Sequence, residues 1–153
     1  MNNILEQLQR EINQLKRQVE AFQSGGYATL QFVPLTVPLE STSWDGDAFS
    51  TVGTATQLDL SAVFGAPAGI KAVLMRVACR DSAAWGTAGL YVILTPDSTV
   101  TETAMICRCY GGDLYTDKTE PIPCDANGDL WYKLAASGSG TLDVVLQIWG
   151  YWI

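Results

Sequence analysis

The chain has 153 residues, of which 48% are hydrophobic and 16% are charged, and this composition is too apolar for an intrinsically disordered protein. It contains no histidine, the side chain that most often acts as a general base or a zinc ligand, which argues against an enzyme. Its net charge of −7 argues against a nucleic-acid-binding protein, because an acidic domain repels phosphate groups.

Residues 1–22 place apolar side chains at alternating steps of three and four, which is the a/d spacing of a coiled coil. The apolar stripe is too narrow for a lone helix to bury, because the residues between are almost all polar. We therefore predict a coiled coil over residues 1–23, and a helix packed on the chain's own head is the alternative. The copies of the chain would associate through Leu5, Leu8, Ile12, Leu15, Val19 and Phe22.

The stripe alone does not decide the number of chains. β-branched residues at a with Leu at d favour two strands, whereas Phe22 suits a wider core. So short a coil is marginal by itself, so the rest of the chain must contribute much of the association energy. A Ser24-Gly25-Gly26 linker follows the stripe.

From Tyr27 onward the apolar pattern has period two, and Gly, Pro, Ser, Thr and Asp separate the alternating runs. The pattern predicts strands over 29–33, 54–60, 70–80, 90–94, 103–110, 130–135 and 142–148, with a loop over 40–52 and a turn over 61–68. Residues 137–140 indicate a hairpin between the last two strands. About eight short strands with Gly-rich turns predict a mainly β head over 27–153, an antiparallel β-sandwich of jelly-roll type.

The end of the chain is unusually aromatic. Alternation places Val145 and Trp149 on the face of the last strand opposite the core, followed by Tyr151 and Trp152. An apolar face of this size is rarely left in contact with water. We predict that these four residues form a subunit interface, and the alternative is a self-contained core with a frayed end.

Four cysteines, Cys79, Cys107, Cys109 and Cys124, raise the question of a metal site. Structural zinc prefers Cys-x₂₋₄-Cys pairs on turns, and the spacing of these residues does not fit. We therefore expect core thiols and no metal, with a disulfide from Cys79 to Cys107 or Cys109 as the alternative.

The segment Asp125-Ala126-Asn127-Gly128-Asp129 resembles half of a calcium-binding loop. The position of its Gly differs from that in an EF-hand loop, and the residue where an EF-hand has Glu is not Glu. Asn-Gly between two strands is typical of a tight turn, which is what we predict here.

Two tryptophans lie in polar stretches that predict loops. Trp44, with Asp45 and Asp47 beside it, and Trp85 are candidate contacts for a surface glycan, because sugars stack their apolar faces on aromatic rings. The alternative is that each tryptophan folds back over the end of the sandwich.

Several short motifs resemble those of small structural proteins of tailed bacteriophages. They are Ser43-Trp44-Asp45-Gly46-Asp47, Leu58-Asp59-Leu60-Ser61, Pro67-Ala68-Gly69-Ile70-Lys71-Ala72-Val73, Arg80-Asp81-Ser82 and Trp149-Gly150-Tyr151. The resemblance covers about residues 43–153 and implies a β-sandwich fibre, knob or capsid-decoration protein, usually a trimer. Trimeric animal heads of the complement and tumour-necrosis type are similar in outline but normally carry a secretion signal.

These observations predict a non-enzymatic homotrimer on the exterior of a virion, without a cofactor. We expect other virion proteins, such as major capsid or tail subunits, as its partners, and neither nucleic acid nor membrane insertion. The polar N-terminus and the lack of a long apolar run predict assembly in the host cytoplasm. The alternative function is a tail-fibre module that binds a host surface glycan.

Overall fold

The computed structural model describes residues 7, 11–16, 30–100 and 103–153. The chain divides into two compact units, residues 1–30 and residues 31–153. Within the described ranges, no helix combines the length and hydropathy needed to cross a membrane.

In the first unit, Gln7 and residues 11–16 are helical. Ile12 and Leu15 lie on this helix with 44% and 59% of their surface exposed, as expected for a stripe that has no partner in a single chain. The remaining predicted stripe residues and the Ser-Gly-Gly linker lie outside the described residues, so the coiled coil stays a prediction; these stripe residues are Leu5, Leu8, Val19 and Phe22.

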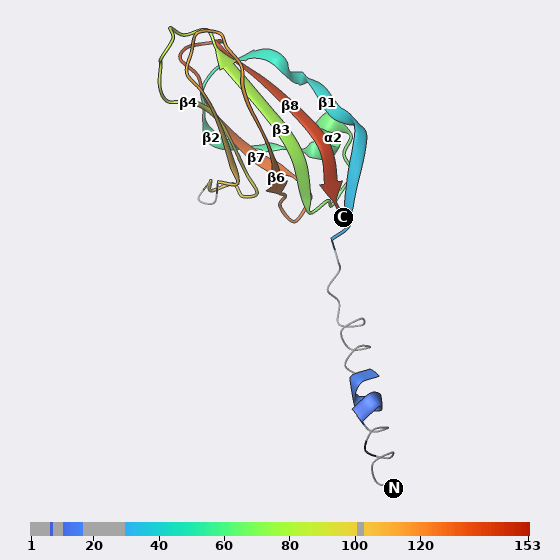
Figure 1. Ribbon diagram of the computed structural model, residues 1–153. Helices are drawn as coiled ribbons and strands as arrows, with labels where there is room; N and C mark the ends of the chain where they lie inside the picture. Colours follow the sequence, from blue (N-terminus) through green and yellow to red (C-terminus); the bar gives the residue numbers. More distant parts are fainter. Residues whose placement is uncertain (1–6, 8–10, 17–29, 101–102) are drawn as a thin grey trace. The chain divides into compact units, whose positions relative to one another are not determined.

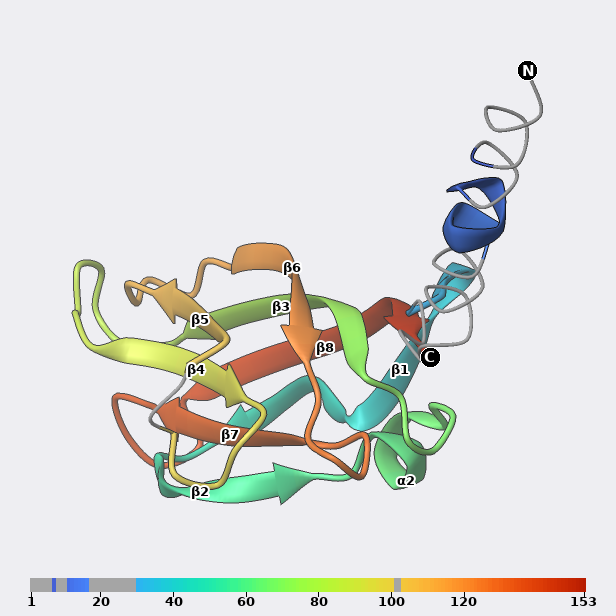
Figure 2. The same cartoon turned by 90° about the horizontal axis from the view of Figure 1, so that it is seen from below.

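The second unit is mainly β, and its described residues form eight strands in two four-stranded antiparallel sheets (Figures 1 and 2). The strands are β1 (Phe32–Phe49), β2 (Val52–Leu58), β3 (Ala72–Asp81), β4 (Leu90–Thr95), β5 (Met105–Cys109), β6 (Thr116–Pro123), β7 (Leu130–Ala135) and β8 (Leu142–Trp152). Sheet A has the order β1-β8-β3-β6 and sheet B the order β2-β7-β4-β5. The predicted antiparallel β-sandwich is therefore confirmed at this level.

The core lies between the two sheets and follows from the period-two pattern. Alternate residues of β3 and β8 point inward from sheet A, among them Met75, Val77 and Val144, none of them exposed to solvent. Val92 and Leu94 of β4 face them from sheet B and are equally buried. Regular alternation of this kind fixes which face of each strand is buried.

β1 corrects the prediction of a loop over 40–52. The strand runs from Phe32 to Phe49 along the edge of sheet A, with irregular register against β8. An edge strand tolerates Pro34 and Pro38, because the missing N–H groups need not pair. The polar side chains that suggested a loop are those that this edge leaves in solvent.

The predicted hairpin around residues 137–140 is also wrong. β7 belongs to sheet B and β8 to sheet A, so the segment between them crosses from one sheet to the other. Part of the predicted turn over 61–68 is a short helix, α2 (Leu60–Phe64), whose N-terminus is capped by the Asp59 side chain. β6 was not predicted, because as an edge strand it buries only Ile122 and shows no apolar alternation.

Candidate functional surfaces of the head

A bulge near the end of β8 decides which C-terminal aromatic residues face outward. Ile148 pairs with Met75 and Gly150 with Leu74, so Trp149 is an extra residue between them. After this bulge Tyr151 pairs with Val73 and packs against the core. The alternation predicted from the sequence is thus shifted.

The shift corrects one predicted interface residue. Trp152 pairs with Ala72 and points to the outer face of sheet A, as do Val145 and Trp149, whereas Tyr151 does not. Tyr151 is therefore a core-packing residue rather than part of an exposed aromatic row.

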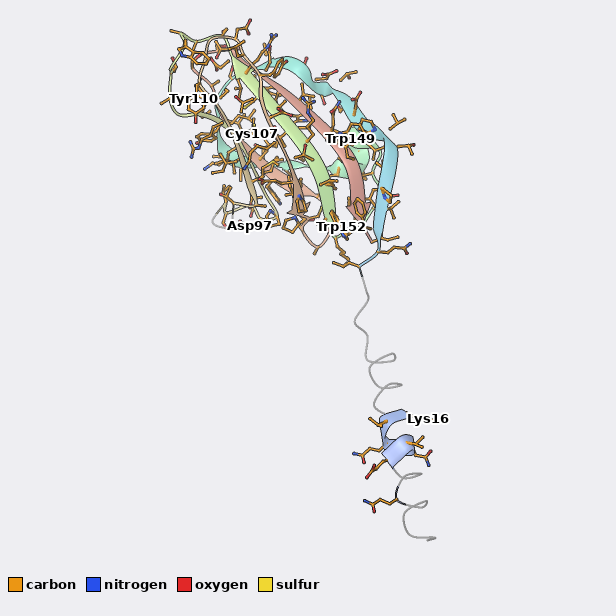
Figure 3. The ribbon with its side chains drawn as sticks, in the orientation of Figure 1. Lys16, Asp97, Cys107, Tyr110, Trp149 and Trp152 are labelled. Carbon is orange, nitrogen blue, oxygen red and sulfur yellow. The ribbon has the colours of Figure 1, made fainter. Side chains whose placement is uncertain are left out.

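The outer face of sheet A carries an apolar patch at the end where β1 begins. Trp149 is 37% exposed and Phe32 is 38% exposed. The Phe32 ring lies 4.6 Å from the Trp152 ring, centroid to centroid, and covers Gly150, where a Cβ atom would come within 2.5 Å of it. We call Phe32, Trp149 and Trp152 the sheet A patch; the labels in Figure 3 show the two tryptophans along β8.

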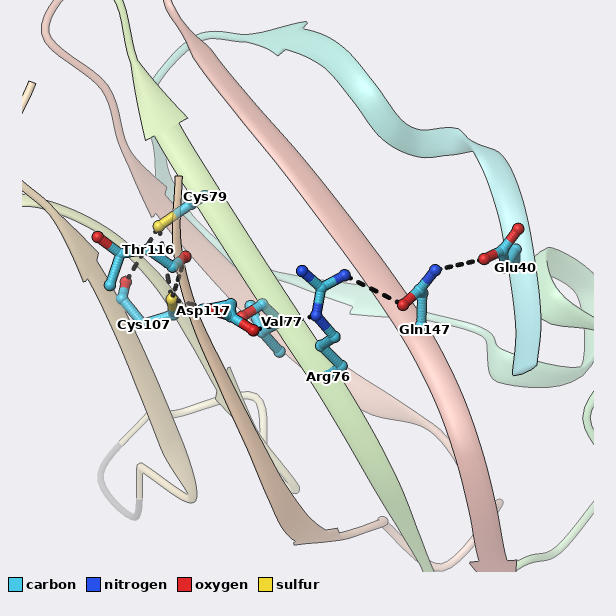
Figure 4. Close-up of polar contacts among 8 residues, drawn as sticks. All are labelled: Glu40, Arg76, Val77, Cys79, Cys107, Thr116, Asp117 and Gln147. Carbon is cyan, nitrogen blue, oxygen red and sulfur yellow. Dashed lines mark hydrogen bonds and ion pairs between the residues drawn. The ribbon is translucent and has the colours of Figure 1, made fainter. Parts of the chain in front are cut away.

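A row of polar side chains crosses all four strands of the same sheet (Figure 4). Gln147 donates to Glu40, Arg76 Nη1 donates to Gln147 Oε1 at 3.1 Å, and Arg76 Nε donates to Asp117 Oδ2 at 3.1 Å. The row is partly solvated, so its net contribution to stability is small. Its members already satisfy one another, which lowers the cost of covering this face with another surface.

At the opposite end of the sandwich, the Asp81 side chain joins two loops. It is fully buried at the end of β3 and accepts hydrogen bonds from Ala83 N at 2.8 Å, Ser137 N at 3.1 Å, Ser137 Oγ at 2.5 Å and Thr141 Oγ1 at 3.1 Å. Burial alone would raise the pKa of Asp81, but the hydrogen bonds led by those from Ser137 outweigh it, so the pKa is lowered. The loops 82–89 and 136–141 are therefore held on one carboxylate.

A third loop, 110–115, is tied to the first by main-chain hydrogen bonds. Gly86 N donates to Tyr110 O at 2.7 Å, Gly112 N to Ala83 O at 2.7 Å, and Asp113 N to Asp81 O at 3.0 Å. These two loops leave four large apolar side chains in solvent: Trp85 is 72% exposed, Tyr110 54%, Leu114 58% and Tyr115 46%. We call these four residues the loop-end platform; Tyr110 marks its place in Figure 3.

The structure does not bring the predicted glycan contacts together. Trp44 is 5% exposed and stacks on Phe49, with the Tyr132 ring edge-on, so it belongs to the core as the alternative interpretation expected. Asp45 and Asp47 lie on β1, opposite Val145 and Val144 of β8.

Of the four predicted glycan residues, only Trp85 is an exposed aromatic residue on a loop. Sequence reasoning missed its neighbours Tyr110, Leu114 and Tyr115. The signal was the Gly111-Gly112-Asp113 turn with aromatic residues on both sides.

Cys79, Cys107 and Cys109 are buried in the core as predicted, whereas Cys124, for which the same was predicted, only packs against the core, and all four thiols are free. Cys79 Sγ and Cys107 Sγ are 3.6 Å apart, facing each other from β3 and β5 (Figure 4). Cys124 is half-buried, and burial raises its pKa to about 12. In the part of the chain that the structure describes, no three acidic, Cys or His residues are grouped as metal ligands would be.

The segment 125–129 forms the predicted tight turn. Asp125 Oδ1 accepts from Asn127 N at 2.8 Å and Asp129 N at 2.9 Å. The Asp129 carboxylate accepts from Leu60 N at 3.2 Å and Gln57 Nε2 at 2.9 Å. Both carboxylates thus support the backbone of the turn and of the start of α2.

No known family model matches the sequence, and no curated protein matches it either. The fold and the two exposed surfaces, the sheet A patch and the loop-end platform, are therefore the features that bear on function.

Proposed function

We propose that the protein is a non-enzymatic structural component of a tailed-bacteriophage particle and acts there as a homotrimer. The sheet A patch carries this proposal, because three aromatic residues on one sheet face are seldom left in water. The motifs that resemble phage structural proteins support the assignment to a virion assembled in the host cytoplasm. Other virion subunits, such as major capsid or tail proteins, are the expected further partners.

The strand order supports a jelly-roll head. The pairs β1–β8, β2–β7, β3–β6 and β4–β5 are all hydrogen-bonded neighbours. Pairs nested in this way arise when one long antiparallel hairpin folds over into two sheets, which is the jelly-roll arrangement.

A second copy of the chain is the partner we propose for the outer face of sheet A. The sheet A patch provides aromatic anchors of the kind that dominate interface energetics. Beside it, the row from Glu40 to Asp117 provides polar groups that are already hydrogen-bonded, so burial leaves few of them unpaired. The exposed Ile12 and Leu15 support a second association element in an N-terminal coiled coil.

Light scattering on the full-length chain tests the oligomer, and we expect the mass of three subunits. Trp149→Ala should weaken association by about 2–4 kcal/mol per site, because it removes an anchor from the sheet A patch. Val37→Ala is the control, since it truncates an apolar side chain on β1 that is 73% exposed and outside the patch. A stable monomer at micromolar concentration, or equal behaviour of the two variants, contradicts the proposed interface.

Ile12→Asp tests the coiled coil separately, because it introduces a charge at a central a position of every chain. We expect strong dissociation in analytical ultracentrifugation, and unchanged association would refute the coiled coil. Gold-labelled antibodies against the protein, viewed on purified phage particles by electron microscopy, test the virion assignment. Particles without label would refute it.

A further inference from the structure

We propose that the loop-end platform binds neutral carbohydrate. The proposal assigns a binding site to Trp85, Tyr110, Leu114 and Tyr115, with Asp113, on the same loop as the last three, as the polar group. It goes beyond the structural role proposed above and does not depend on it, since the platform is formed within one head.

Two of the rings are supported on one side and open on another. A Cβ atom at Gly112 would lie 2.7 Å from Trp85 Cε3, so the indole rests close against the backbone of the neighbouring loop. The Arg80 guanidinium lies 4.8 Å from the centroid of the Tyr115 ring and covers one of its faces. The remaining surfaces of Trp85 and Tyr115 are open, which suits stacking against the apolar face of a sugar ring.

The loops that carry these rings are held in place before any ligand arrives. Main-chain hydrogen bonds join 82–89 to 110–115, and the buried Asp81 carboxylate ties the first of these loops to 136–141. Gly111 allows this close approach, because a Cβ atom there would be 2.3 Å from Ala84 O. Ordering of the loops therefore costs little on binding, which favours recognition of a small ligand.

The charges near the platform favour a neutral ligand. The Asp113 carboxylate is 63% exposed and lies 3.4 Å from Arg80 Nε, so its free lone pairs can accept hydrogen bonds from sugar hydroxyl groups. Arg80 is also paired with Asp143 at 2.8 Å, which leaves little positive charge for an anion. The net charge of −7 on the chain adds long-range repulsion of phosphorylated or acidic polymers.

An array of neutral and anionic oligosaccharides, probed with the full-length chain, tests the proposal. We expect binding to neutral oligosaccharides, and a loss of about tenfold or more in affinity for Trp85→Ala. Trp85→Phe should retain part of the binding, because it keeps an aromatic face. Val37→Ala is the matched control, with 73% exposure against 72% for Trp85, and should bind as the wild type does.

Three results would overturn the proposal: no neutral oligosaccharide bound, binding only to anionic ones, or full binding by Trp85→Ala. Thermal unfolding and light scattering on the same samples separate this test from the proposed oligomer. Trp85→Ala should keep the wild-type melting temperature and mass, since its side chain is mostly in solvent. If this surface binds a protein instead of a carbohydrate, no oligosaccharide on the array should bind.

Discussion

Replacement of Asp81 by asparagine tests how the loop end of the head is held together. The carboxylate is fully buried and accepts its four hydrogen bonds from Ala83, Ser137 and Thr141. An asparagine side chain has one acceptor oxygen, and its NH₂ group faces donors where the second oxygen was. On either orientation of the amide, one backbone N–H group, that of Ala83 or that of Ser137, loses its acceptor, whereas the Ser137 and Thr141 hydroxyl groups can rotate to accept from the new NH₂ group.

The expected magnitude follows from that lost acceptor. A buried donor left without an acceptor costs about 1–3 kcal/mol, so we expect a loss on the order of 2 kcal/mol. For a unit spanning residues 31–153, this loss corresponds to a melting temperature lower by on the order of 8 °C. Differential scanning calorimetry measures it directly, and urea unfolding at 25 °C gives the free energy independently.

The pH dependence has a defined sign. Burial raises the pKa of Asp81, but its hydrogen bonds lower the pKa by more, so the folded value lies below the ordinary one. Such a group contributes its full stability above the unfolded pKa of about 3.9, and the contribution disappears as the pH falls through the folded pKa. The difference between wild type and Asp81→Asn should therefore be constant between about pH 5 and pH 7 and shrink below about pH 4.

Asp113→Asn is the matched control, because it makes the same chemical change at the same end of the head. The Asp113 side chain is 63% exposed and its ion pair with Arg80 is 3.4 Å long, so we expect a loss below about 1 kcal/mol. Equal losses for the two variants would refute the role given to Asp81. A melting temperature of Asp81→Asn within error of wild type would refute it as well.

The remaining predictions concern the turns and the thiols. Gly128→Ala should lower the free energy of unfolding in urea by more than about 2 kcal/mol, because Gly128 has a positive φ and a Cβ atom there would lie 2.8 Å from Gly69 N. Gly46→Ala, also at positive φ but in open space, should cost about 1 kcal/mol, and equal costs would contradict this prediction. The four free thiols should react with a disulfide reagent at about pH 8 only after the protein unfolds. Three of them are buried, and burial raises the pKa of Cys124 to about 12, so little reactive thiolate is accessible in the native protein. Rapid labelling of the native protein would contradict this prediction. A chelator should leave the melting temperature of the protein unchanged within error, because Asp125 already accepts hydrogen bonds from backbone N–H groups and is not needed as a metal ligand. A drop of several degrees would contradict this prediction.

Sequence patterns by themselves determined those elements whose burial alternates regularly. The strand predicted over 70–80 is β3 (Ala72–Asp81), and the strand predicted over 142–148 lies within β8 (Leu142–Trp152). Period two is a local property, so one stretch of chain suffices to identify such strands and their buried faces. The same reasoning placed the thiols of Cys79 and Cys107 in the core.

Tertiary structure decided what depends on a partner strand. The edge strands β1 and β6 keep polar side chains in solvent, so their sequences show no regular alternation of apolar and polar residues. Their pairing with β8 and β3 could therefore not be read from the sequence. The bulge at Trp149, set by register against β3, turned Tyr151 inward.

The loop-end platform is also a product of the tertiary structure. Trp85 and Tyr115 lie on different loops, which meet because β3 and β6 are neighbours in sheet A and β4 and β5 are neighbours in sheet B. No sequence period reports which loops share an end of the sandwich, since that follows from strand order. The main-chain hydrogen bonds that join these loops, such as Gly112 N to Ala83 O, exist only once the sheets have formed.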